Sequence, residues 1–220
     1  MTKNFYFIKE DKVLSKDFTK ELLIKFDQIY ARDMYKNVAP TIRELVYEDT
    51  LKEPLFNSLL KKIQKKFELL IGKSDLMFLK IWLVYSKSNH TNKNILPYIP
   101  HIDRLRKLKA MVYLHDIQLE HGPIHLGKVK KEINIEQKRN NLPEDFQEKG
   151  LNSIDEDHLE NILTPMVGGA GDIVFFDTNT PHKAGIVKEG FYRKVLRFDF
   201  ERPNYNPKQT ILKRLINRFK

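Results

Sequence analysis

Two segments in the first third of the chain place apolar residues at helical spacing. They span residues 16–30 and 54–71. Ser15 precedes the first segment as a candidate N-cap, and Gly72 follows the second, where a left-handed cap is expected. We therefore predict two amphipathic helices that cover one face of a sheet system. The apolar stripes consist of Phe18, Leu22, Leu23, Phe26 and Ile29 or Tyr30 in the first segment, and of Leu55, Leu59, Leu60, Ile63, Phe67, Leu70 and Ile71 in the second.

From residue 78 onward the pattern becomes that of β-strands. Residues 78–86, 108–114 and 172–177 are predicted strands, and the last is an almost continuous apolar run typical of a buried strand. Residues 194–201 form a fourth predicted strand. Arg193, directly before it, shares a face with Arg197, because side chains two positions apart project to the same side. The mainly apolar face carries Lys194, Leu196, Phe198 and Phe200, and the mainly polar face carries Arg193, Val195, Arg197 and Asp199.

Two further segments depart from this pattern. Residues 128–164 are charged, weakly periodic and longer than an ordinary connection, so they are predicted to form either an active-site lid or a surface loop. Residues 204–220 are predicted to contain a C-terminal helix that packs on the strand core or on a second subunit, which would make the protein a homo-oligomer. The apolar stripe of this helix consists of Ile211, Leu212, Leu215, Ile216 and Phe219.

The composition favours one domain. The chain has 220 residues, of which 41% are hydrophobic and 11% aromatic, and this is enough to bury a sizeable core. We predict a single domain over residues 1–220, with mainly helical support in residues 1–77 and a β core in residues 78–203. No apolar run approaches the roughly 18 residues of a membrane span, and the N-terminus has no apolar signal region. A cytoplasmic location is therefore expected.

The formal net charge of +10 raises the question of a nucleic-acid partner. The basic residues are scattered along the chain and are not interleaved with aromatic residues on one platform, which disfavours nucleic acid. A cationic surface would instead concentrate anionic small molecules around the protein. The expected partner is a small-molecule substrate, and the charge favours an anionic one.

The candidate chemistry lies in a His-x-Asp tripeptide and a distant histidine. His101 and Asp103 are two positions apart, so their side chains project to the same side of an extended segment. His182 follows an Asn-Thr-Pro turn after the strand predicted over residues 172–177, which places it on a loop at the mouth of a strand. Two histidines and one carboxylate can occupy one face of an octahedral Fe(II) ion. Because the chain has no cysteine, nitrogen and oxygen are the strong ligands that it offers to a metal.

In the segments around His101, Asp103, His182 and Arg193, the chain resembles the phytanoyl-CoA dioxygenase-like family of Fe(II)- and 2-oxoglutarate-dependent oxygenases. The resemblance covers about residues 79–201. It implies a mainly β fold with flanking α-helices: a double-stranded β-helix, which is a cupin-like jelly-roll, with the N-terminal helices packed outside. The matching stretches are Pro100-His101-Ile-Asp103, Lys109-Ala-Met-Val-Tyr-Leu114, Gly122-Pro123-Ile124, Gly169-Ala-Gly-Asp172-Ile-Val-Phe-Phe-Asp177, Pro181-His182-Lys-Ala-Gly185 and Arg193.

The resemblance also implies a role for each matching polar residue. His101, Asp103 and His182 would hold Fe(II) and serve catalysis, and Arg193 would bind the distal carboxylate of the co-substrate 2-oxoglutarate. A guanidinium suits that role because its planar fork grips a carboxylate with two parallel hydrogen bonds. The second co-substrate is O2, the products include succinate and CO2, and the implied reaction is hydroxylation of a small metabolite. Halogenating relatives lack the carboxylate, so Asp103 argues against halogenation.

The substrate side of the site is less clear from the sequence. After Gly122-Pro123 the chain departs from the family's frequent Pro-Gly-Ser-His stretch, and this segment usually borders the substrate. We take His125, Lys128 and Arg197 as candidate substrate-lining residues, with an Arg197–Asp199 ion pair on a solvated face as an equal alternative for Arg197.

Two other functions stay open at this point. One is a nucleic-acid demethylase of the same fold, which the basic charge and the Arg193-x-x-x-Arg197 pair suggest. The absence of an obvious base-stacking segment disfavours it. The other is a catalytically silent barrel that binds a ligand without turnover.

Overall fold

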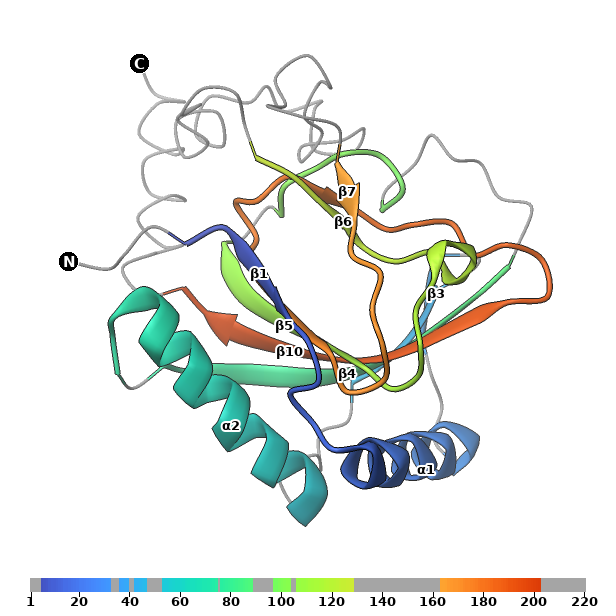
Figure 1. Cartoon of the computed structure of the whole chain (residues 1–220), viewed down its shortest axis with the longest axis horizontal. Coiled ribbons are helices and arrows are strands. Elements are labelled where there is room, and N and C mark those ends of the chain that lie inside the picture. The colour runs from blue at the N-terminus through green and yellow to red at the C-terminus, as the bar shows by residue number, and fades with distance from the viewer. Residues whose placement is uncertain are drawn as a thin grey trace, which may run out of the picture.

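A seven-stranded antiparallel sheet forms the main layer of the molecule (Figure 1). The computed structural model describes residues 5–32, 36–39, 42–46, 53–74, 76–88, 97–103, 106–128 and 163–202. The spatial order of the strands is β1 (Phe7–Glu10), β8 (Ile173–Asp177), β5 (Lys107–Tyr113), β10 (Tyr192–Glu201), β4 (Phe78–Lys87), β3 (Ile42–Val46) and β2 (Lys36–Ala39). The ten-residue strands β4 and β10 pair with each other along almost their whole length.

A smaller sheet lies above the main sheet in Figure 1. Its strands are β7 (Thr164–Pro165), β6 (His125–Leu126) and β9 (His182–Lys183), in that order, and the short 3-10 helix η2 (Leu119–His121) precedes β6. An isolated β-bridge between His101 and His182 adds a further segment to the β9 edge. From β4 onward the chain therefore passes repeatedly between the two layers: β4, β5, β8 and β10 lie in the main sheet, and the His101 segment, β6, β7 and β9 lie in the small one.

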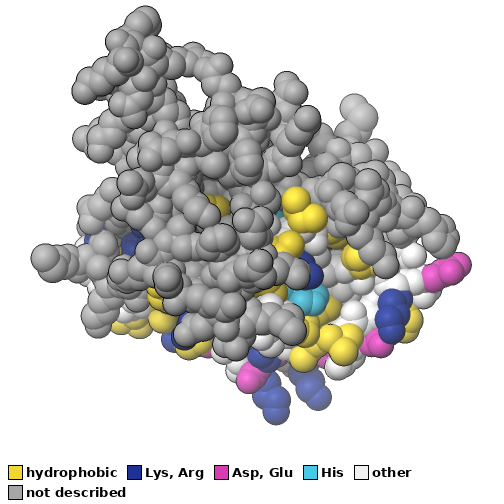
Figure 2. All heavy atoms as spheres, turned by 90° about the horizontal axis from the view of Figure 1, so that it is seen from above, with side chains coloured by type: hydrophobic (Ala, Val, Ile, Leu, Met, Phe, Trp, Pro, Cys, Tyr) yellow, Lys and Arg dark blue, Asp and Glu magenta, His cyan; other side chains and the backbone are white. Residues whose placement is uncertain are grey.

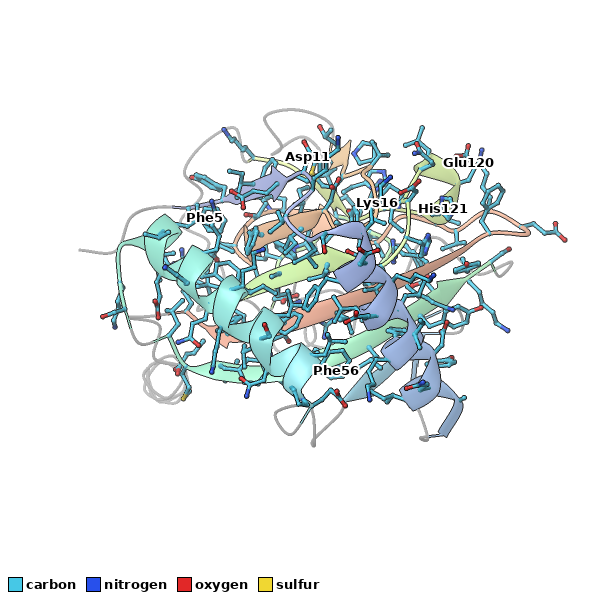
Figure 3. The ribbon with its side chains drawn as sticks, turned by 60° about the horizontal axis from the view of Figure 1, so that its bottom comes forward. Phe5, Asp11, Lys16, Phe56, Glu120 and His121 are labelled. Atoms are coloured by element: carbon cyan, nitrogen blue, oxygen red, sulfur yellow. The ribbon has the colours of Figure 1, made fainter. Side chains whose placement is uncertain are left out.

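Helices α1 (Lys16–Arg32) and α2 (Pro54–Ile71) lie across the other face of the main sheet, as their apolar stripes predict (Figures 1 and 3). Ser15 Oγ accepts a hydrogen bond from the Phe18 backbone N–H at 3.2 Å, which caps α1. Helix α2 ends at Gly72, whose φ of 67° is left-handed and whose N–H bonds to the Glu68 carbonyl. Among the described residues, no helix combines the length and the apolar character needed to cross a membrane.

The central strands of the main sheet are buried on both faces. Alternate residues of β10 show this: Leu196, Phe198 and Phe200 belong to the apolar cluster beneath α1 and α2, whereas Val195 belongs to a second cluster between the two sheets. The alternation predicted for residues 194–201 is confirmed. It places Arg193 and Arg197 on the face that looks into the inter-sheet space, together with Val195.

The region before β4 contains short strands as well as the two predicted helices. Besides α1 and α2 it contributes β1, which pairs with β8, and the hairpin β2–β3, which pairs with β4. The segments that form β1, β2 and β3 show no strict alternation of apolar and polar residues by which the sequence would reveal a strand. Residues 129–162 of the predicted insert and the helix predicted over residues 204–220 lie outside the described residues.

The helix-side core generates a stability prediction. Phe67 of α2 is fully buried, and its ring makes edge contacts with Phe175 at 5.2 Å and with Phe200 at 5.4 Å between centroids. Phe67→Ala removes these contacts and leaves a cavity, so we expect the free energy of unfolding to fall by about 3–5 kcal/mol. Leu69, two positions along the same helix, is 68% exposed. Leu69→Ala is the matched control and should change this free energy by less than about 0.5 kcal/mol. Equal losses in urea titrations of the two variants would contradict this packing.

Candidate metal centre

Backbone pairing brings His101 and His182 together. The His101 N–H donates to the His182 carbonyl at 2.9 Å, and the His182 N–H donates to the His101 carbonyl at 2.8 Å. Residues that exchange both bonds stand directly opposite each other, and the two ring centroids are 4.3 Å apart. Asp103 completes the group, with its Oδ1 atom 3.4 Å from Nε2 of His182. Ligand atoms from the three residues, which we call the triad, lie within 4.8 Å of one another.

Backbone carbonyls orient both imidazole rings. Nδ1 of His101 lies 2.8 Å from the Ile99 carbonyl, and Nδ1 of His182 lies 2.8 Å from the Thr180 carbonyl. A carbonyl oxygen only accepts hydrogen bonds, so each Nδ1 donates to its carbonyl and Nε2 is the ring atom left to bind a metal ion. Metal-binding histidines in proteins usually have such an acceptor at the second ring nitrogen. Nε2 of His182 and Oδ1 of Asp103 face each other, and both are atoms that bind metal ions.

Burial keeps His101 neutral. Its side chain is 7% exposed. Burial and, next, the neighbouring His182 ring lower the pKa of His101 to about 3, although the hydrogen bond to Ile99 and the charge of Asp103 oppose this shift. His101 is therefore unprotonated at neutral pH, which is the form of imidazole that binds a metal ion.

A lysine holds the second oxygen of Asp103. Nζ of Lys109, on β5, lies 2.5 Å from Asp103 Oδ2, while Oδ1 faces His182. Burial raises the pKa of the Asp103 carboxyl, but the positive charge of Lys109 holds this pKa well below its usual range. Asp103 is therefore a carboxylate with one oxygen turned to Lys109 and the other turned to the histidines.

A buried ionic cluster ties together the segments that carry the triad. Arg106 donates to both carboxylate oxygens of Asp177, at 3.0 to 3.1 Å, and Arg202 donates to the same carboxylate at 2.8 Å. Arg106 follows Asp103 in the chain, Asp177 begins the turn toward His182, and Arg202 follows β10. This cluster joins three strand ends and restricts the movement of the triad segments relative to one another.

Arg193 is a buried cation on the inter-sheet face of β10. It is 4% exposed, and its Nη2 donates to Ser86 Oγ at 3.2 Å. Within the described part of the chain, its Nε and Nη1 atoms have no hydrogen-bond partner and no carboxylate pairs with it. Burial lowers the pKa of Arg193, and the Tyr113 and Tyr98 side chains oppose the shift. A buried charge without a counter-ion is costly, so this guanidinium is suited to bind an anionic ligand.

One apolar cluster connects Arg193 with the triad. Phe176 contacts the His182 ring at 5.3 Å between centroids, and Tyr98 and Tyr113 lie within electrostatic range of Arg193. All three aromatic residues belong to the cluster between the two sheets. The triad and Arg193 therefore border the same inter-sheet space.

Arg197 faces the same space but is already paired. Its Nε donates to Asp199 Oδ1 at 3.1 Å, and its guanidinium lies 4.6 Å from the centroid of the Trp82 ring. The indole N–H of Trp82 also donates to Asp199, at 3.0 Å. The ion pair considered in the sequence analysis is thus present, and a role for Arg197 in lining the substrate stays a prediction.

His125 and Lys128 do not join the triad. In the small sheet His125 pairs with Lys183 and Leu126 pairs with His182, so His125 and His182 project to opposite faces. The His125 ring is half-buried, and its Nδ1 lies 3.0 Å from the Pro123 carbonyl. Lys128 is exposed. Figure 2 looks onto the molecule from the side of the small sheet, where apolar, basic and histidine side chains are exposed together.

Solved structures identify the class of fold. SnoN, a non-heme alpha-ketoglutarate-dependent epimerase from nogalamycin biosynthesis, matches with a TM-score of 0.66 and 19% identity over 90% of this chain and 78% of its own. HygX from Streptomyces hygroscopicus, solved with nickel and 2-oxoglutarate bound, matches with a TM-score of 0.60 and 15% identity over 92% of this chain and 85% of its own. A prolyl-4-hydroxylase from Pseudomonas putida matches with a TM-score of 0.58 and 14% identity over 91% of this chain and 95% of its own. This chain has the fold of Fe- and 2-oxoglutarate-dependent oxygenases.

Another matching structure, also of SnoN, contains Fe3+, alpha ketoglutarate and nogalamycin RO. The comparisons do not assign this chain to a subfamily of these oxygenases. No family model and no curated protein matches this chain. The phytanoyl-CoA dioxygenase-like subfamily therefore stays a prediction.

Sequence reasoning missed four residues around the site: Lys109, Tyr113, Ser86 and Tyr98. Lys109 and Tyr113 occupy alternate positions of the strand predicted over residues 108–114, with Met111 between them, and their shared inward face was a usable signal. Ser86 meets Arg193 because the register of β4 and β10 pairs them. Tyr98 lies in a turn without periodicity, so the sequence offered no signal for it.

The triad generates a metal-binding prediction. Single changes of His101, Asp103 or His182 to alanine should weaken Co(II) binding by more than the roughly 10- to 100-fold that loss of an outer partner costs, because each removes a direct ligand. Anaerobic cobalt titrations followed by absorption would measure this loss. His121→Ala is the matched control, since that histidine lies outside the triad and its Nδ1 only accepts a hydrogen bond from Gln118. Undiminished cobalt binding in any two triad variants would contradict the assignment.

Proposed function

We propose that this protein is an Fe(II)- and 2-oxoglutarate-dependent dioxygenase that hydroxylates a small, anionic metabolite. The observation that carries the proposal is the juxtaposition of the triad with Arg193, a buried guanidinium without a counter-ion in the described part of the chain, in one inter-sheet space. The triad offers two imidazole nitrogens and one carboxylate oxygen, a donor set that suits Fe(II). Arg193 offers a planar donor to a dicarboxylate.

The donor set fits the group that the fold family uses. His101, Asp103 and His182 would hold Fe(II), and Arg193 together with Ser86 would bind the far carboxylate of 2-oxoglutarate. Bound iron and 2-oxoglutarate supply oxidative attack on a C–H bond, with consumption of O2 and release of succinate and CO2. The chain's own task is to orient these groups and to limit water, and the apolar cluster between the sheets serves that task.

The finer description of the fold belongs to the same proposal. The alternation of the chain between the two sheets from β4 to β10 is the connectivity expected of a double-stranded β-helix, or jelly-roll. We further propose that residues 1–220 form one domain of the phytanoyl-CoA dioxygenase-like group. The matching motifs around the triad and Arg193 support this assignment.

The direct test is stimulation of 2-oxoglutarate turnover by a substrate. Protein loaded anaerobically with Fe(II) is mixed with 2-oxoglutarate, O2 and fractionated metabolite pools, and succinate release is measured. We expect one anionic fraction to stimulate succinate release and its active compound to gain one oxygen atom by mass spectrometry. The His182→Ala variant is the matched control. Iron and 2-oxoglutarate binding without turnover in any fraction would favour a silent barrel, and stimulation by methylated oligonucleotides would favour the demethylase.

The role of Arg193 generates a co-substrate prediction. Arg193→Ala should raise the apparent dissociation constant of 2-oxoglutarate roughly 30- to several-thousand-fold, because loss of a carboxylate clamp in a partly dry site costs about 2–5 kcal/mol. Arg193→Lys should restore only part of the affinity, since an ammonium lacks the planar fork. Arg197→Ala is the control on the same face and should leave 2-oxoglutarate affinity nearly unchanged, because Arg197 is already paired with Asp199.

A stability measurement separates the clamp from a structural role. Arg193→Met removes a buried charge that lacks a counter-ion among the described residues, so its melting temperature without 2-oxoglutarate should equal or exceed that of the wild type.

A strong rise in the apparent dissociation constant of 2-oxoglutarate for Arg197→Ala but not for Arg193→Ala would assign the clamp to the other arginine.

A further inference from the structure

We propose that Lys109 is a positioning residue that keeps one carboxylate oxygen of Asp103 away from the metal and thereby leaves a coordination position for 2-oxoglutarate. This inference rests on the proposed function. It is based on the different partners of the two Asp103 carboxylate oxygens: Oδ2 lies 2.5 Å from Lys109 Nζ, and Oδ1 lies 3.4 Å from His182 Nε2. A free aspartate can bind an ion through one oxygen or through both.

The position of Lys109 is fixed by its strand. Lys109 lies in the middle strand of three, paired with Asp199 of β10 on one side and with Phe176 of β8 on the other. Its side chain is 12% exposed, so little solvent competes for the ammonium. A charge-assisted hydrogen bond from such a rigid donor is among the stronger polar contacts in proteins. Rotation of Asp103 to offer both oxygens to an ion would break this contact.

Neighbouring basic residues on the same face have other partners. Lys107, two positions earlier on β5, lies 4.0 Å from Asp199. Lys80 of β4 lies over the Trp82 ring at 4.3 Å from its centroid. Lys107 therefore provides a matched comparison: it shares the strand, the face and the charge of Lys109 and lies within reach of the Asp103 charge, but its ion pair is with Asp199.

The proposal predicts opposite changes in two affinities. A lysine beside the carboxylate repels a cation and withdraws electron density from the ligand, so its removal should leave metal affinity equal or higher. A hydrogen-bond acceptor beside a metal-binding histidine has the opposite effect: it makes the imidazole more basic and raises metal affinity. Without Lys109, both oxygens of Asp103 become available to the ion. The second oxygen then competes with the co-substrate for the coordination position.

The test is a pair of titrations on Lys109→Met and on the control Lys107→Met. Co(II) is titrated first, and 2-oxoglutarate is then titrated into the cobalt-loaded protein by anaerobic calorimetry. We expect Lys109→Met to bind Co(II) at least as tightly as the wild type and 2-oxoglutarate about tenfold or more weakly. The visible spectrum of its bound Co(II) should also differ from that of the wild type. Lys107→Met should match the wild type in all three measurements.

Two other results would overturn the proposal. A parallel loss of Co(II) affinity, 2-oxoglutarate affinity and melting temperature in Lys109→Met would show a merely structural ion pair, and unchanged 2-oxoglutarate affinity would show that Asp103 needs no such restraint. If Lys109→Met does not fold, Lys109→Gln removes the charge with less change in polarity and is expected to give the same pattern. Failure of the wild type to bind Co(II) and 2-oxoglutarate would instead refute the proposed function, and the role of Lys109 with it.

Discussion

The two backbone hydrogen bonds between His101 and His182 determine the geometry of the site. They join segments that are far apart in the chain and set the two imidazoles 4.3 Å apart. A slip of one residue in this pairing would turn a histidine to the opposite face of the small sheet. Neighbouring contacts restrain the register, because the Asp103 N–H donates to Thr178 and the Ala184 N–H donates to Pro97. The cluster of Arg106, Asp177 and Arg202 adds ionic restraint to the same segments.

The inter-sheet space combines an apolar lining with charges that the fold does not fully compensate. Asp103 has Lys109 as its counter-ion, whereas Arg193 has only Ser86 as a hydrogen-bond partner among the described residues. Leaving a guanidinium in that state costs stability, and a bound anion recovers part of that cost. The same imbalance would favour an anionic ligand over a neutral one of the same size, which would leave the charge uncompensated.

The main sheet separates stability from chemistry. Its outer face packs against α1 and α2 through large apolar side chains such as Phe175, Phe198 and Phe200. Its inner face carries Lys109, Arg193 and Arg197, which alternate along β5 and β10 with outward apolar residues of the same strands. Because the two sets share the same strands, the packing of the helices holds the polar side chains in place. The helix-side core therefore supports the site from the opposite face of the sheet.

The sequence alone determined the local features whose cause is local. Helical spacing and the caps Ser15 and Gly72 predicted α1 and α2, and alternation predicted that Arg193 and Arg197 share a face. The spacing of His101 and Asp103, with His182 after a buried strand, indicated a metal group. The short strands β1, β2 and β3 escaped prediction because their stability comes from pairing with β8 and β4, not from their own periodicity.

Only the tertiary structure decided which charges are compensated and by which residues. Lys109 pairs with Asp103, and Arg197 contacts Asp199 and Trp82. Arg193, on the same strand face as Arg197, has Ser86 as its one hydrogen-bond partner among the described residues. Two arginines four positions apart look equivalent in the sequence. Their difference arises from the cross-strand register, which pairs Arg193 with Ser86 and Arg197 with Trp82. Register is a property of strands that are distant in the chain, so the sequence pattern of one strand cannot determine it.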